Sequence, residues 1–245
     1  MMMLMSMVSL LLSGVAGIPR SYTPRLDDGV SIILVCCFFL SSFVLSRNRK
    51  FLLQLIKDFL LHRQRTSIFS TSTASDMRSL LLLTLQTCML CAILLFCIFL
   101  ETTPELIVQH SSLLLLAIYF AICMLYVVLK WLAYSLIGWI FFDGEKVELW
   151  IESYSTLLYY LGFALFPFVL LEVYFAFDLP VLLSISLIFL LFVKILEFYK
   201  WLKLFCAHFY GVILLIMYFC ALEVMPYVLL FYGILQLNEC LIIKN

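Results

Sequence analysis

Long apolar runs constrain this chain more than any other feature of its sequence. Each run has about 18 residues or more, enough for an α-helix to cross a hydrocarbon core about 30 Å thick. Backbone groups in lipid have no water to bond, so helices rather than open strands must fill such runs. The sequence therefore predicts an all-α integral membrane protein, a bundle of six transmembrane helices over residues 29–46, 78–100, 111–130, 153–177, 180–200 and 208–234.

Composition supports the same class. Of the 245 residues, 66% are apolar and 12% are charged, whereas soluble domains are about half apolar and a quarter charged. A soluble core has no room for this surplus, so much of the apolar surface must face lipid. The formal net charge of zero gives no general reason to expect nucleic acid as a partner.

The chain begins with a separate apolar stretch, residues 1–18, ahead of a polytopic membrane domain over residues 19–245. The stretch ends in the small residues Ser13-Gly14-Val15-Ala16-Gly17, which suit signal peptidase. No Lys or Arg precedes it, although signal peptides ordinarily start with basic residues. We expect a short helix that is retained as a seventh span or signal anchor, with a cleaved signal peptide as the alternative.

Basic residues are divided unequally between the two sides of the predicted bundle. Three of them, Arg20, Arg25 and Lys244, fall on one side. Because cytoplasmic loops carry an excess of Lys and Arg, the other side is expected to be cytoplasmic and the C-terminus to lie on the opposite face. That other side has twelve basic residues in or beside its segments: Arg47, Arg49, Lys50, Lys57, Arg63, Arg65, Arg78, Lys130, Lys146, Lys194, Lys200 and Lys203.

Residues 49–65 have the pattern of an amphipathic helix that lies in the membrane interface. Apolar residues such as Leu52 and Leu55 share one helical face, and Lys57 lies on a polar face. Such a helix directs its basic side chains toward anionic headgroups, so we expect anionic lipid to bind here. The alternative is a plain extension of the first span.

The third span continues past Lys130 into Trp131–Phe142 before an Asp143-Gly144 turn. A straight continuation would make the helix too long for the membrane. We therefore expect a bend into the interface after Lys130.

Glu223 is the clearest candidate for a functional residue, because ionisable groups at membrane depth are costly and usually have a role. It belongs to a run that contains Tyr218, Cys220 and Pro226. Pro226 cannot donate a hydrogen bond to the carbonyl of Leu222, which leaves an acceptor free beside the carboxyl. Glu223 is then either a proton-binding or gating carboxyl, or a protonated side chain that fastens helices together.

Glu172 and His208 are weaker candidates. Glu172 lies toward the end of its span, where we expect its carboxyl to reach the interface; the alternative is a second carboxyl near the level of Glu223. His208 begins the last span and is more simply an interfacial residue. Lys194 and Glu197, spaced i and i+3, are expected to neutralise each other at an interfacial helix end.

Enzymatic signatures are missing from the sequence. There is no His-Glu-x-x-His, no Gly-x-Ser-x-Gly and no phosphate-binding glycine loop. The three histidines do not pair across the bilayer, so we expect neither haem nor metal. Cys88-Met-Leu-Cys91 has the spacing of a redox pair but lies in the middle of a span. No cofactor and no enzymatic activity are expected.

The order of these parts resembles an uncharacterised family of polytopic inner-membrane proteins of Bacteroidota, classified as a domain of unknown function. Three segments carry the resemblance, which covers residues 24–234: Asp27-Asp28-Gly29-Val30 at the entry to the first span, the basic stretch Arg49–Phe59, and Tyr218-Phe-Cys220-Ala-Leu-Glu223-Val-Met-Pro226 in the last span. The resemblance implies a Gram-negative inner membrane, and hence a periplasmic C-terminus. It also strengthens the case for Glu223, but it implies no activity.

These observations favour a non-enzymatic integral inner-membrane subunit that scaffolds or assists a cell-envelope complex, in secretion or energised transport. Other membrane protein subunits are the expected partners. The alternative is a small transporter or proton-conducting protein that uses Glu223 and Glu172. An intramembrane enzyme is a third, less favoured hypothesis.

Overall fold

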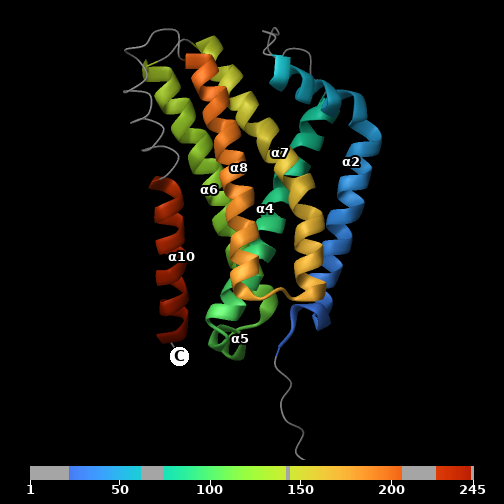
Figure 1. The fold of residues 1–245 in the computed structure, drawn as a ribbon, viewed down its shortest axis with the longest axis vertical. Coiled ribbons are helices and arrows are strands. Elements are labelled where there is room, and N and C mark those ends of the chain that lie inside the picture. Colours follow the sequence, from blue (N-terminus) through green and yellow to red (C-terminus); the bar gives the residue numbers. More distant parts are fainter. Residues whose placement is uncertain (1–21, 62–73, 142–143, 206–224, 244–245) are drawn as a thin grey trace, which may run out of the picture.

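The computed structural model describes residues 22–61, 74–141, 144–205 and 225–243, and these ranges are helical almost throughout (Figure 1). No strand occurs within them. The predicted all-α class is therefore confirmed. The elements are η1 (Pro24–Leu26), α2 (Asp28–Leu61), α4 (Ala74–Thr102), α5 (Glu105–Gln109), α6 (Ser112–Phe141), α7 (Gly144–Phe175), α8 (Leu179–Phe205) and α10 (Met225–Ile243).

Five of these helices are long and apolar enough to cross a membrane, and they coincide with the first five predicted runs. A multi-pass helical membrane protein is thus confirmed, although the exact number of spans stays a prediction. The predicted run 208–234 is described only from Met225, and α10 continues past residue 234 to Ile243. Residues 1–18 lie outside the described residues. The five candidate spans are Asp28–Lys50, Arg78–Thr102, Ser112–Leu136, Leu149–Phe175 and Leu179–Lys200.

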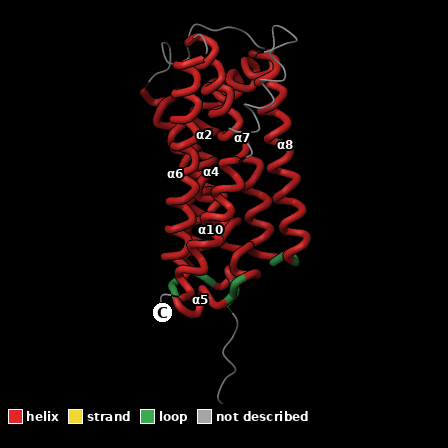
Figure 2. Tube along the Cα trace, turned by 90° about the vertical axis from the view of Figure 1, so that its left-hand side faces the viewer, coloured by secondary structure: helices red, strands yellow, loops and turns green. Residues whose placement is uncertain are grey.

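The helices form an upright bundle in which successive helices run in opposite directions (Figures 1 and 2). The short α5 and the α7–α8 connection lie at one end, which we call the α5 end. The last residues of α2 and α6 lie at the other, which we call the basic end. Helix α4 occupies the centre, in contact with α2, α6, α7 and α8. Its apolar residues Leu90, Ala92 and Ile93 are completely buried and form the middle of the core.

Close packing of α4 on α7 depends on a small residue. A Cβ atom added at Gly162 on α7 would collide with the hydroxyl of Thr87 on α4. That hydroxyl lies 2.8 Å from the carbonyl oxygen of Leu83 on its own helix and 3.1 Å from the carbonyl oxygen of Leu158 on α7. Small residues allow membrane helices to approach closely and to share such polar contacts. Gly162 and Thr87 therefore fix how near these two helices lie.

At the α5 end, Asp27 holds the start of α2 in place. Its backbone is extended (φ −87°, ψ 114°), and its carboxylate accepts a hydrogen bond of 2.8 Å from the backbone N–H of Gly29. This is the arrangement of a helix N-cap. The same carboxylate also accepts hydrogen bonds from the hydroxyl of Tyr22, at 2.6 Å, and from that of Ser112 on α6. We call Asp27, Tyr22 and Ser112 the Asp27 clasp.

At the basic end, α2 changes direction. Asn48 has non-helical backbone angles (φ −118°, ψ 23°), and the helix then crosses the top of the bundle (Figure 1). The sequence predicts that the apolar face of residues 49–65 enters lipid. Instead, Leu52 and Leu55 are buried against protein, because the helix folds back onto α4 and α7. The position of this segment in the membrane interface stays a prediction.

Candidate functional site: a buried ion cluster between α6 and α8

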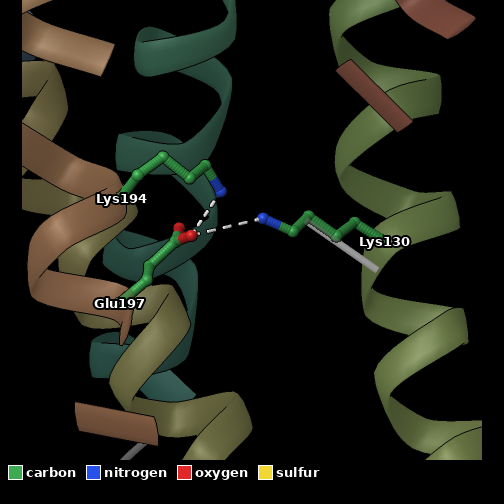
Figure 3. Close-up of polar contacts among 3 residues, drawn as sticks. All are labelled: Lys130, Lys194 and Glu197. Carbon is green, nitrogen blue, oxygen red and sulfur yellow. Dashed lines mark hydrogen bonds and ion pairs between the residues drawn. The ribbon is translucent and has the colours of Figure 1, made fainter. Parts of the chain in front are cut away.

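Three charged side chains meet inside the bundle, which we call the ion cluster: Lys130 on α6 and Lys194 and Glu197 on α8 (Figure 3). The ammonium nitrogen of Lys130 lies 3.6 Å from Oε2 of Glu197. Lys194 donates a hydrogen bond to the same oxygen. Lys130 is 3% exposed and Glu197 is 2% exposed. One buried carboxylate oxygen therefore binds two ammonium groups.

The cluster lies within the membrane-spanning part of the bundle, toward its basic end. Lys130 is inside the candidate span Ser112–Leu136, and Lys194 and Glu197 are inside Leu179–Lys200. Charged groups at such depth pair with one another because an isolated charge in lipid is costly. The ion pair between α6 and α8 follows from this cost, and Figure 3 shows Lys130 extending across from α6 to reach Glu197.

Four tyrosine rings surround the ammonium group of Lys130, and one of them also contacts that of Lys194. The ammonium nitrogen of Lys130 lies 4.6 Å from the ring centre of Tyr154 on α7 and 5.6 Å from that of Tyr227 on α10. Lys194 lies 4.6 Å from the same Tyr227 ring. Such cation–π contacts are stronger where water is excluded. The tyrosine cage therefore brings α7 and α10 to the ion cluster, and its members are Tyr126, Tyr134, Tyr154 and Tyr227.

The side chains of this arrangement suit a structural role, in which they hold helices together. The arrangement brings two ammonium groups to one carboxylate, with tyrosine rings packed against the ammonium groups. Within the described ranges there is no group of three or more His, Cys, Asp or Glu side chains that could hold a metal ion. The arrangement can hold four helices together at one level. A change in the charge of one of its side chains should therefore weaken the contact between these helices.

The structure corrects two sequence predictions about these residues. Lys130 does not mark the membrane edge, and α6 continues as one helix to Phe141 instead of bending after it. Lys194 and Glu197 do not only neutralise each other on one helix, since Glu197 is buried and paired with Lys130 on α6 as well. In both cases the cause is a charged partner on another helix, which a single helix cannot reveal. One signal was present: Tyr126 and Tyr134 stand four residues before and after Lys130, on the same helical face.

Glu172 is also buried, at the α5 end of α7, with 5% exposure. The predicted extension to the interface is therefore wrong. The chain turns sharply here, with Ala176 in the left-handed region (φ 48°), and the backbone of Phe177 hydrogen-bonds the carboxyl of Glu172. This turn keeps the carboxyl inside the bundle. Its Oε2 atom has no hydrogen-bond partner among the described residues.

The other predicted site residues are mostly beyond what the structure describes. Glu223, Tyr218, Cys220 and His208 fall in residues 206–224, outside the described ranges. Pro226 is described near the start of α10 and is half-buried. It immediately precedes Tyr227, so the predicted motif leads directly into the tyrosine cage. The role proposed for Glu223 stays a prediction.

Comparison with known proteins gives a family and no activity. No curated protein and no solved structure matches this chain. The model of one family, described as "Domain of unknown function (DUF4271)", matches residues 30–234. That range includes the ion cluster and the whole tyrosine cage, and it agrees with the resemblance expected over residues 24–234. The chain therefore belongs to the family described as domain of unknown function DUF4271.

Proposed function

We propose that the protein is a non-enzymatic subunit of the bacterial inner membrane that scaffolds or assists a cell-envelope complex, in secretion or energised transport. One observation carries the proposal: the buried carboxylate of Glu197 is paired with both Lys130 and Lys194. A scaffold needs dry, paired charges that hold its helices in fixed positions, whereas a carrier needs a charged group that its cargo can reach. The ion cluster matches the first requirement.

The proposed orientation places the basic end in the cytoplasm and the C-terminus in the periplasm. Lys130 and Lys200 are buried, and Lys194 is paired with Glu197 inside a candidate span, so these three should not count as loop charges. Removing these three from the twelve basic residues of that side still leaves nine against three. Single cysteines at Lys50 and Asp178, in a background without native cysteines, test this in intact cells with an impermeant thiol reagent. Labelling at position 178 alone supports the orientation, and labelling at position 50 alone overturns it.

Affinity purification from native membranes tests the proposed role. The tagged full chain, cross-linked in its membrane, should carry specific membrane proteins in near-stoichiometric amounts. A variant with Lys203→Glu, an exposed change on α8, serves as a control for general charge effects and should retain the same partners. Recovery of the chain alone, from both native membranes and cross-linked samples, would contradict a role as a subunit.

A second candidate function is proton conduction, and the buried carboxyl of Glu172 favours it. An ionisable group with an unpartnered oxygen at membrane depth is a candidate proton carrier. Reconstituted in vesicles, the protein would then carry a proton flux that Glu172→Gln abolishes, with the folded state unchanged. Absence of flux in the unmodified protein, together with recovered partners, would leave the scaffold as the better account.

A further inference from the structure

The segment of α2 beyond Asn48, residues 49–61, forms an arm that is fixed to the bundle. Two of its leucines, Leu52 and Leu55, are 3% and 4% exposed and pack with Leu83 on α4. The hydroxyl of Tyr160 on α7 donates a hydrogen bond of 2.7 Å to the backbone carbonyl of Leu52. The arm therefore has a defined position, and its opposite face points away from the bundle.

That outward face combines cations with an apolar side chain. Lys50, Leu53 and Lys57 follow at intervals of three and four residues, so they share one helical face. All three are exposed, Leu53 to 50%. Arg47 and Arg49 are exposed beside them. Within the part of the chain that the structure describes, these four cations make no ion pair with a carboxylate.

The position of the arm along the membrane normal decides which part of the lipid these cations contact. The candidate span of α2 ends at Lys50, which places the turn at Asn48 and the start of the arm where the hydrocarbon gives way to headgroups. Basic side chains at this level, around an exposed leucine, face phosphates on one side and acyl chains on the other. Charge complementarity therefore selects a negatively charged lipid.

We propose that the arm, together with Arg47 just before it, binds the headgroups of anionic phospholipids in the adjacent leaflet through Arg47, Arg49, Lys50 and Lys57. Its buried leucines dock the arm on protein and its cations engage the lipid. This differs from the lipid-inserted helix that the sequence predicts, in which the apolar face is the membrane anchor. The proposal does not depend on the scaffold function.

The test uses the purified full chain in detergent, titrated with dansyl-labelled phosphatidylglycerol and, separately, dansyl-labelled phosphatidylcholine. Energy transfer from tryptophan to dansyl reports binding. The expected result is tighter binding of phosphatidylglycerol, with a preference that declines as salt rises. Since each Lys or Arg near an anionic surface contributes about fivefold in affinity, Arg49→Gln/Lys50→Gln should weaken phosphatidylglycerol binding about twentyfold or more and leave phosphatidylcholine binding unchanged.

The matched control is Arg25→Gln/Lys203→Gln, which removes one Arg and one Lys, both exposed and both outside the arm. It should keep the preference for phosphatidylglycerol. Millimolar inorganic phosphate should not displace the labelled lipid. An unchanged preference in the arm variant, an equal loss in the control, or full displacement by inorganic phosphate would each overturn the proposal. All four substitutions are at exposed positions, and thermal unfolding of each preparation establishes that the bundle remains folded.

Discussion

Asp27 shows how one side chain can organise the end of a membrane bundle. Burial alone would raise the pKa of its carboxyl, but hydrogen bonds from Ser112, Tyr22 and the backbone N–H groups of Gly29 and Val30 outweigh burial and lower that pKa below its ordinary value. The pKa of the Tyr22 hydroxyl is raised, by burial and by its hydrogen bond to Asp27. The ionised carboxylate is therefore the form that the folded protein prefers.

Removal of this carboxylate should destabilise the protein in a pH-dependent way. Because the folded state lowers the pKa of Asp27, the clasp stabilises the fold at pH values above about 4, the ordinary value for aspartate. That stability is lost as the pH falls further, through the lowered pKa. Asp27→Ala should cost about 1 kcal/mol of stability at pH 7. Thermal unfolding in detergent should show a constant difference from the unmodified protein at neutral pH that shrinks below about pH 4. A difference that grows as the pH falls would contradict the clasp.

At the scale of the elements, α4 and α7 pack closely because Gly162 has no side chain at their contact. Gly162→Ala places a methyl group against Thr87, and overpacking of this kind costs about 1–3 kcal/mol. Gly233 on α10 is the matched control, because a Cβ there meets nothing within 4 Å. Gly233→Ala should be neutral or stabilising, since alanine favours helix by up to about 1 kcal/mol. Unfolding temperatures that fall equally in both variants would rule out the packing explanation.

The helices could be predicted from the sequence and the ion cluster could not, for a physical reason. A transmembrane run such as 78–100 can be recognised from its own residues. Each membrane-spanning helix must form its backbone hydrogen bonds internally and carry apolar side chains toward lipid, so its sequence is apolar throughout. The partnership of Lys130 with Glu197 joins two helices that are distant in sequence. Likewise, the Asp27 motif is visible at the entry to α2, but its bond to Ser112 on α6 depends on how the helices assemble.

The described part of the molecule is a bundle that carries many apolar side chains outward and buries a few charged ones, such as Glu197, inside. Exposed residues such as Phe39 and Phe192, at 65% and 60% exposure, suit a lipid or partner surface. The ion cluster and the tyrosine cage join α6, α7, α8 and α10 at the basic end. On this account the cluster is the main fastening of the bundle at that level, and reversing one of its charges leaves like charges buried side by side.

Exchange of the two charges between α6 and α8 tests this claim most directly. Lys130→Glu and Glu197→Lys, made separately, each disrupt the pairing and should reduce the yield of folded, monodisperse protein severely, as loss of one buried partner costs about 3–5 kcal/mol. The double variant again has one carboxylate facing two ammonium groups, so it should recover a substantial part of that yield. Lys203→Glu, exposed on α8, should have no effect. Normal yield from both single variants, or a double variant no better than the worse single one, would contradict the account.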